Sequence, residues 1–365
     1  MKNHVATYGT NRRTGNAIQT MLEPEQFRPP WYLRNGHVQT ILTGFYKPKP
    51  NLPTPIEHRI PLGENGFSLV FENQPGQPNQ RYQDEAVLLL HGLGSSHAGT
   101  YMTSMAMRLL ENGVRVFRAD LPGAGRSGQL TPLPPHGACF EEIWSSLLHL
   151  RDRLGIRRWR ISGVSLGGNI LLKMLAAKHS LIDSGDASRE LSVLRAVSLA
   201  PPIRLTDCSR HMEHGLHRLY ANYFMLSLRQ QAKARAKFWP QWASRLEKAS
   251  FETIRKFDET VTAPLAGFRD AEEYYTAGSS AAWLDQIQVP MVILIDKHDP
   301  IVPAWMFDGV ALSPSTILRT TEYGGHVGYL HRGCKLGRID TDHSNRKSIH
   351  RWSDAWIAQE LLQNS

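Results

Sequence analysis

Short apolar runs alternate with amphipathic stretches along most of the chain. The runs that predict buried strands lie at residues 85–90, 114–119, 158–162, 193–199, 289–295 and 315–321. The amphipathic stretches that carry apolar side chains at helical spacing lie at residues 99–111, 138–154 and 168–179. Strands and helices in this alternation predict an α/β fold, a mostly parallel sheet covered by helices on both faces.

Further elements are expected near both ends of this pattern. Residues 55–62 and 67–73 flank Gly-Glu-Asn-Gly, which predicts a hairpin. A helix is expected between the strands at 289–295 and 315–321, and a final helix over about residues 343–362.

The alternation stops for about eighty residues in the second half of the chain. This segment is rich in Arg, Lys, Gln and aromatic residues and has no run typical of a strand. We expect residues 203–285 to form a helical cap inserted into a core made of residues 31–202 and 286–365. Residues 1–30 would form a surface arm, and the aromatic stretch 29–41 is expected to pack.

The composition narrows the class of protein. Of 365 residues, 41% are hydrophobic and 21% are charged, which is typical of a soluble globular protein. The three cysteines, Cys139, Cys208 and Cys334, give no disulfide framework and favour a reducing compartment. The N-terminal stretch has no apolar core of a secretory signal, and no run of about 18 apolar residues predicts a membrane span. We therefore expect a cytoplasmic protein.

The chain also carries a formal net charge of +9. Such a charge could serve an anionic partner, which includes nucleic acid, a lipid surface or an acidic substrate. The basic residues are scattered, and the densest run, residues 229–237, is typical of one solvated helix face. We expect no nucleic-acid partner, whereas peripheral contact with an anionic membrane stays open.

One serine lies between glycines where a predicted strand gives way to a predicted helix. Gly163-Val-Ser-Leu-Gly167 fits the G-x-S-x-G motif in the strand, turn and helix context that the motif requires. The two glycines remove Cβ atoms that would collide in a sharp turn. The turn also directs the N–H of Leu166 toward the space above Ser165, where an oxyanion would form. Ser165 is therefore the candidate nucleophile.

A serine hydroxyl needs a base, and the base needs an orienting acid. In this topology both follow the serine, on loops after later strands. Asp299 in Asp-Pro-Ile-Val-Pro and His326 in Gly-Gly-His-Val-Gly occupy such loops. Asp296 is an alternative acid without that proline context, and His331 is an alternative base without the glycines. We favour Asp299 and His326.

A second oxyanion donor is expected from the loop after an earlier strand. The candidate is the backbone N–H of Leu93 in His91-Gly-Leu-Gly94. Metal-dependent hydrolysis is a poor competitor, because the chain has no H-E-x-x-H motif. His211, His214 and His217 follow one another at three-residue spacing, but Gly215 interrupts the helix that they would share. We expect neither a metal nor a cofactor.

Together these segments resemble the α/β-hydrolase superfamily, and within it the branch of YheT-like hydrolases. The segments that carry the resemblance are Asn35-Gly-His-Val-Gln-Thr-Ile41, His91-Gly-Leu-Gly-Ser-Ser96, Gly163-Val-Ser-Leu-Gly-Gly-Asn169, Gly267-Phe-Arg-Asp-Ala-Glu-Glu-Tyr-Tyr275, Asp299-Pro-Ile-Val-Pro303 and Gly324-Gly-His-Val-Gly328. The resemblance runs from about residue 28 to 330 and implies hydrolysis of carboxylic esters or acyl transfer, without a cofactor.

Two positions depart from the pattern of that branch. Its members often have proline where this chain has Gly36, which implies a looser loop here. Relatives with acyltransferase activity carry an acid five residues after the catalytic histidine, a position that His331 holds in this chain. Acyl transfer is therefore not the leading expectation.

The pattern as a whole predicts a serine esterase. Ser165 would attack the ester carbonyl, His326 would take the serine proton, and Asp299 would orient the imidazole. An apolar cap suits short- to medium-chain acyl esters as the small-molecule substrate. The candidate pocket residues are Tyr220, Tyr223, Phe224, Phe268, Tyr274 and Tyr275. The alternatives are an acyltransferase that passes the acyl group to an alcohol and a non-catalytic binding module with a basic surface.

Overall fold

The structure is a computed structural model that describes residues 27–48, 51–177, 191–332 and 349–363. Residues 1–26 of the expected N-terminal arm lie outside the described residues. The same is true of Cys334, of residues 178–179 and of the first six residues of the last predicted helix.

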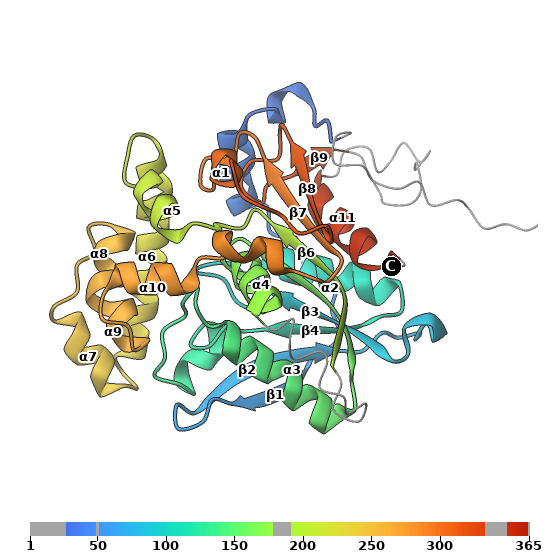
Figure 1. Cartoon of the computed structure of the whole chain (residues 1–365), viewed down its shortest axis with the longest axis horizontal. Helices are drawn as coiled ribbons and strands as arrows, with labels where there is room; N and C mark the ends of the chain where they lie inside the picture. Colours follow the sequence, from blue (N-terminus) through green and yellow to red (C-terminus); the bar gives the residue numbers. More distant parts are fainter. Residues whose placement is uncertain (1–26, 49–50, 178–190, 333–348, 364–365) are drawn as a thin grey trace, which may run out of the picture.

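Eight strands form one sheet through the centre of the molecule (Figure 1). In chain order they are β1 (Ile56–Pro61), β2 (Phe67–Asn73), β3 (Glu85–Leu90), β4 (Arg115–Ala119), β5 (Arg158–Val164), β6 (Ser192–Leu199), β7 (Met291–Asp296) and β8 (Thr316–Thr321). Across the sheet the order is β1-β2-β4-β3-β5-β6-β7-β8. The pairs β1–β2 and β2–β4 are antiparallel and the others are parallel. The predicted hairpin and the predicted mostly parallel sheet are confirmed.

Helices cover both faces of this sheet. On one face lie α2 (Thr100–Glu111) and α11 (Trp352–Leu361), which pack with Val87 and Leu89 of β3. On the other lie α3 (Phe140–Leu154) and α4 (Leu166–Ala177), which pack with Ala86, Leu88 and Leu90. Successive side chains of a strand point to opposite faces, so a strand covered on both sides is apolar throughout. All six residues of β3 are buried, which explains the apolar run Ala86–Leu90, and the charged first residue, Glu85, is paired with Arg158 and Arg160.

The segment between β6 and β7 is helical throughout its regular elements. It contains α5 (Leu205–His211), α6 (His217–Arg235), α7 (Pro240–Leu246), α8 (Ile254–Phe257), the π turn η6 (Asp258–Thr262), α9 (Ala263–Leu265), α10 (Ala271–Gly278) and the 3-10 turn η7 (Ala281–Gln286). Helices α6 to α10 lie beside the sheet rather than on its faces (Figure 1). We call residues 205–286 the helical region. Its division from the core at residues 203 and 285 stays a proposal.

The helical region is tied to the core by buried hydrogen bonds. Asn169 of α4 donates to the carbonyl of Gly278 (2.7 Å). Arg235 of α6 donates to the carbonyls of Gly123, Thr131 and Leu133, and its guanidinium stacks on Trp242. Both anchors satisfy backbone carbonyls of neighbouring segments, so they hold the helical region against the core.

The structure corrects two predicted helices. Between β7 and β8 there is only the short 3-10 turn η8 (Ala304–Phe307), because Pro300 and Pro303 remove two N–H donors that a helix would use. The last helix, α11, begins at Trp352. Residues Ile349–Arg351 instead form strand β10, which pairs with β9 (Leu330–Arg332). A tertiary pairing across the chain decides this boundary, and no local pattern indicates it.

The aromatic stretch at residues 29–41 packs on one side only. Leu33 and Gln39 are buried, whereas the Trp31 side chain is 80% exposed. The helix α1 (Gly36–Phe45) begins in this stretch and is capped by the side chain of Asn35, which accepts from the N–H groups of His37 and Val38. Among the described residues, no helix has both the length and the apolar character needed to cross a bilayer.

Candidate active site

Ser165 lies at the tip of a sharp turn between β5 and α4. Its φ of +52° is in the left-handed region, which costs about 1 kcal/mol or more for a residue with a side chain. A Cβ on Gly163 would lie 2.3 Å from the carbonyl oxygen of Gly167, and one on Gly167 would lie 2.5 Å from that of His91. Only glycine fits at these two positions, which is the physical reason for the motif.

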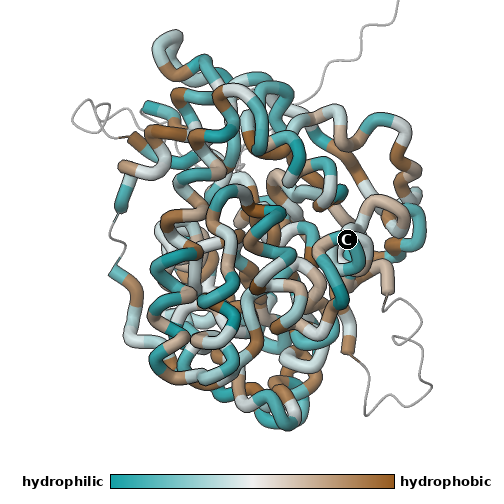
Figure 2. The backbone as a smooth tube through the Cα atoms, turned by 90° about the vertical axis from the view of Figure 1, so that its left-hand side faces the viewer, coloured by the Kyte–Doolittle hydropathy of each residue, from teal (hydrophilic) through white to brown (hydrophobic). Residues whose placement is uncertain are grey.

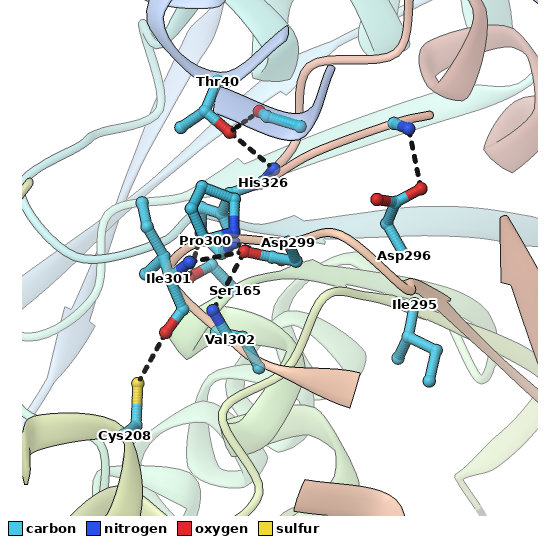
Figure 3. Close-up of polar contacts among 12 residues, drawn as sticks. Thr40, Ser165, Cys208, Ile295, Asp296, Asp299, Pro300, Ile301, Val302 and His326 are labelled. Carbon is cyan, nitrogen blue, oxygen red and sulfur yellow. Dashed lines mark hydrogen bonds and ion pairs between the residues drawn. The ribbon is translucent and has the colours of Figure 1, made fainter. Parts of the chain in front are cut away.

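The structure brings Ser165, His326 and Asp299 together at the carboxyl edge of the sheet (Figure 3). Ser165 Oγ lies 3.1 Å from His326 Nε2. His326 Nδ1 lies 2.8 Å from Asp299 Oδ2. The three side chains come from loops after β5, β7 and β8. These strands are parallel, so their carboxyl ends meet at the same edge.

Asp299 is held by its own loop. Its Oδ1 accepts from the N–H groups of Ile301 (2.8 Å) and Val302 (2.9 Å), which leaves Oδ2 for His326. The Asp299 and His326 side chains are 1% and 8% exposed. Two backbone donors hold one carboxylate oxygen of Asp299, so the other oxygen is positioned to accept from the imidazole.

The alternative acid and base occupy other positions. Asp296 accepts from Thr321 Oγ1 (2.7 Å) and from the N–H groups of Gly324 (2.6 Å) and His298 (3.0 Å), and so it joins the loops after β7 and β8. Burial raises the pKa of Asp296, and the bonds that it accepts act in the opposite direction. His331 lies on β9 with its ring 6.3 Å from that of Phe27. Neither residue is hydrogen-bonded to Ser165 or His326 in the structure.

Helix α1 supports the histidine loop, a role that the sequence did not predict. Thr40 Oγ1 accepts from the N–H of His326 (2.9 Å) and donates to the carbonyl of Gly36 (2.7 Å). The fully buried Gln39 pairs with the backbone of Leu330 through both its carbonyl (2.7 Å) and its amide (3.0 Å). The local signal for this role is the adjacent polar pair Gln39 and Thr40, whose type alone does not indicate which backbone groups they bind.

Gly36 permits the close contact between α1 and the acid loop. A Cβ at this position would lie 1.9 Å from the carbonyl oxygen of His298. The carbonyl of Gly36 in turn approaches Gly325, where a Cβ would lie 2.4 Å from it. The resemblance implied a looser loop at Gly36, and the structure shows the opposite, a position too crowded for any side chain.

The two candidate oxyanion donors flank Ser165. Leu166 follows it directly as the first residue of α4, and Leu93 lies in the loop after β3. That loop is close to the serine, since a Cβ on Gly92 would lie 3.1 Å from Ser165 Cβ. It is held by Tyr101, whose hydroxyl accepts from the N–H of Gly92 (2.9 Å). The roles of Leu93 and Leu166 stay predictions.

His91 fixes the same loop from the other side. Burial lowers the pKa of His91, which favours the neutral ring. The ring nitrogen Nε2 then accepts from the N–H of Leu121 (3.1 Å), in the loop after β4. A neutral histidine used in this way is a scaffold for the loop, and it leaves His326 as the histidine that faces the serine.

The six candidate pocket residues lie in different surroundings. The Tyr220 hydroxyl is 2.8 Å from His37 Nδ1 of α1, and Tyr223 is 68% exposed. Phe224 and Phe268 are partly buried and pack against the core. Their place in a substrate pocket stays a prediction.

Tyr274 and Tyr275 are buried, and their hydroxyls have partners inside the protein. The Tyr274 hydroxyl accepts from the N–H of Gly137 (2.9 Å). The Tyr275 hydroxyl donates to Asp258 Oδ2 (2.8 Å). These bonds assign both tyrosines a packing role, whatever else they contact.

A cavity of about 470 Å³ lies between the helical region and the core. Its lining residues are Gly94, Ser95, Ser96, Ala98, Gly99, Gly123, Gly125, Gly128, Gln129, Gln231, Ala234, Arg235 and Phe238. It contains none of the six predicted pocket residues and does not reach Ser165. It begins at Gly94, directly after the candidate oxyanion donor Leu93. The loops after β3 and β4 supply most of its wall.

The histidine-rich stretch does not form a single helix face. Helix α5 ends at His211, α6 begins at His217, and Gly215 between them has a φ of +56°. The rings of His211 and His217 lie 4.0 Å apart. Among the residues that the structure describes, no group of three or more His, Cys, Asp or Glu side chains could hold a metal ion.

Comparisons with known proteins identify the family. A family model described as the alpha/beta hydrolase fold matches residues 85–332. The Escherichia coli protein named "Putative esterase YheT" is 28% identical over 84% of this chain and 87% of its own length. Human phospholipase ABHD3 is 26% identical over 84% of this chain and 74% of its own. The monoacylglycerol lipase of Saccharomyces cerevisiae is 27% identical over 67% of this chain and 54% of its own.

Proposed function

We propose that this chain, which belongs to the α/β-hydrolase fold family, is a serine hydrolase that cleaves carboxylic esters through an acyl-enzyme on Ser165. The observation that carries the proposal is the row of hydrogen bonds from Ser165 Oγ through His326 to Asp299. Relatives named as esterase, phospholipase and monoacylglycerol lipase support the class of carboxylic ester hydrolase.

His326 is the general base of the proposed first step. Asp299 Oδ2, at 2.8 Å, accepts the Nδ1 proton, so the lone pair of the neutral ring is on Nε2. Nε2 takes the proton of Ser165 Oγ from 3.1 Å as the serine oxygen attacks the ester carbonyl. The buried carboxylate of Asp299 then stabilises the imidazolium that results.

The tetrahedral intermediate requires donors for its oxyanion. The proposed donors are the backbone N–H groups of Leu93 and Leu166, and one such donor typically contributes about 10²–10³ in rate. The leaving alcohol takes the proton from His326 Nε2. Water then attacks the acyl-enzyme with His326 again as the base, and the carboxylic acid leaves.

The proposed substrates are esters of short- to medium-chain acyl groups. This size class is inferred from the apolar and aromatic side chains of the helical region, and not from the cavity of about 470 Å³, whose lining does not include Ser165. Initial rates on p-nitrophenyl esters of graded chain length test the size. A flat profile from acetate to palmitate would contradict it.

Covalent labelling with a fluorophosphonate tests the nucleophile. The wild-type chain is expected to label, and Ser165→Ala is expected to lose both labelling and ester hydrolysis. Ser227→Ala, which changes a serine on α6 close to Gly94, is the matched control and should label like the wild type. Equal labelling of Ser165→Ala and the wild type would remove Ser165 from its assigned role.

A further inference from the structure

Two helices with exposed apolar faces meet next to the candidate active site. Helix α1 and helix α6 meet where His37 Nδ1 lies 2.8 Å from the Tyr220 hydroxyl, with the two rings stacked at 5.9 Å. Each helix also touches the catalytic loops. Thr40 of α1 binds the N–H of His326, and His217 of α6 lies 2.7 Å from the carbonyl oxygen of Pro300.

Large apolar side chains protrude from both helices. On and just before α1, Trp31 is 80% exposed and Phe45 is 78% exposed, and three more, at 40–49%, are Tyr32, Ile41 and Leu42. On and just before α6, four side chains that are 58–68% exposed follow a helical spacing of three and four residues: Leu216, Leu219, Tyr223 and Leu226. We call these nine residues the apolar rim.

The rim on α6 is a true outer face. The residues of α6 that pack inward are Ala221, Met225, Leu228, Ala232 and Arg235, which lie on the opposite side of the helix at 100° per residue. Figure 2 turns the helical region toward the viewer and shows hydrophobic positions interspersed with hydrophilic ones along it. A single exposed leucine is ordinary, whereas nine exposed large apolar side chains on two helices that meet indicate an interaction site.

The charge of the same two segments selects the partner. Residues 28–47 and 217–235 contain seven Lys or Arg residues and no Asp or Glu. Six of the seven are exposed: Arg28, Arg34, Lys47, Arg218, Arg229 and Lys233. Two exposed acids elsewhere on the surface are each paired with a lysine, Glu252 with Lys256 at 2.5 Å and Glu322 with Lys297 at 2.8 Å.

We propose that the apolar rim docks on an anionic lipid surface. Aromatic and aliphatic side chains that enter the headgroup region, surrounded by basic side chains that meet anionic lipids, are the two components of interfacial binding. Nucleic acid is the less suitable partner, because it would use the basic residues but leave the aliphatic ones in water. The docking does not need Ser165, so it goes beyond the proposed hydrolysis.

Co-sedimentation with vesicles tests the docking in the Ser165→Ala chain, so that its outcome is independent of catalysis. Strong binding is expected to vesicles of phosphatidylglycerol and phosphatidylcholine, and weak binding to phosphatidylcholine alone. Arg229→Gln and Lys233→Gln are each expected to weaken partition about fivefold, and added salt should weaken it further. Leu219→Gln with Leu226→Gln, or Trp31→Gln with Phe45→Gln, should weaken it more than about tenfold.

Matched controls lie at the far edge of the sheet, on β1. Ile56 is 50% exposed and Arg59 is also exposed, so Ile56→Gln and Arg59→Gln remove the same kinds of group away from the rim. Both controls should bind like the parent chain. In the active chain, all of these surface substitutions should change hydrolysis of a soluble p-nitrophenyl ester less than about twofold, which shows that the variants fold.

Two results would overturn the proposal. One is vesicle binding that the rim variants and the β1 controls weaken equally. The other is tight binding of duplex DNA that survives Leu219→Gln with Leu226→Gln, together with no preference for anionic vesicles, which would assign the basic surface to nucleic acid instead.

Discussion

The loops at the carboxyl edge of the sheet and the helical region use buried polar groups in different ways. In the loops, side chains bond across long sequence distances: Thr40 to His326, Gln39 to Leu330 and Asp296 to Gly324. Arg235 and Tyr274 tie the helical region to the core, but Asp258 and Tyr275 bond to each other within the region. The first arrangement fixes the relative position of reacting groups, whereas the second stabilises a local packing unit. Substitutions of residues that bond directly to His326, such as Asp299 and Thr40, should therefore lower the rate, whereas substitutions within the helical region should act on stability.

The largest contrast is expected between the two aspartates after β7. Asp299→Asn keeps an oxygen that can accept from the N–H groups of Ile301 and Val302, but it presents an amide NH₂ to His326. The ring proton of His326 then lies on the wrong nitrogen, so kcat should fall about 10⁴-fold. Asp296→Asn should lower kcat less than about tenfold and act mainly on the melting temperature, by leaving one buried donor without an acceptor. Kinetics and thermal unfolding of both variants check this. Equal losses of kcat in the two variants would show that both carboxylates serve the same catalytic role.

A pH-dependent stability effect is expected from the helical region. Burial raises the pKa of Asp258 from 3.8 to about 6. The folded chain then holds a proton that the unfolded chain has lost. The contribution of Asp258 to the free energy of unfolding is therefore full below about pH 4 and declines as pH rises to about 6. The decline amounts to about 3 kcal/mol in the free energy of unfolding.

Asp258→Asn should remove that decline. The free energy of unfolding of the variant minus that of the wild type should rise by about 3 kcal/mol from about pH 4 to pH 7, with other titrating groups cancelling in the difference. Denaturant unfolding at several pH values measures it. A difference that stays constant with pH would show that Asp258 is ionised over the whole range.

Gly36→Ala should affect the catalytic loops although residue 36 touches no reacting atom. The new Cβ would meet the carbonyl of His298 at 1.9 Å, so α1 or the acid loop must move. A displacement of about 1 Å in the row of Ser165, His326 and Asp299 typically costs about 10²-fold in kcat/KM. Gly44→Ala, on the open side of the same helix with no neighbour within 4 Å, is the control and should be neutral or stabilising. Identical kinetics of the two variants would contradict a tight contact at Gly36.

The smallest effect is expected at Thr40, a positioning residue. Thr40→Val removes the acceptor for the His326 N–H and should lower kcat about tenfold with KM nearly unchanged. Thr40→Ser should restore the rate, because the serine hydroxyl can make both hydrogen bonds. Thr43→Val, one turn further along α1 at a hydroxyl that has no partner, is the control. A fall in stability without the kcat effect would assign Thr40 to folding alone.

The strands of the core could be predicted because burial on both faces imposes a local pattern. The unbroken apolar run of β3 and the glycines around Ser165 each reflect one physical constraint that acts over a few residues. The chain order of Ser165, Asp299 and His326 follows from the topology, and the structure brings these side chains together.

The remaining features depend on contacts between distant parts of the chain. The Tyr274 hydroxyl bonds to Gly137, and strand β10 forms only because β9 lies beside it. Helix α1 reaches a loop almost three hundred residues further along, through Thr40 and His326. A periodic pattern carries no information on such pairings, so the predicted pocket role of the aromatic residues in the helical region rests on their residue type alone.

The support that α1 gives to the histidine loop sets a limit on how far the enzyme can be shortened. The stretch that matches the family model, residues 85–332, contains Ser165, Asp299 and His326 but not α1, the β1–β2 hairpin or α11. A protein trimmed to that stretch would keep Ser165, Asp299 and His326 but would lose helix α1, which holds the His326 loop in position. Truncation screens that judge success by retention of the three side chains would therefore select inactive fragments.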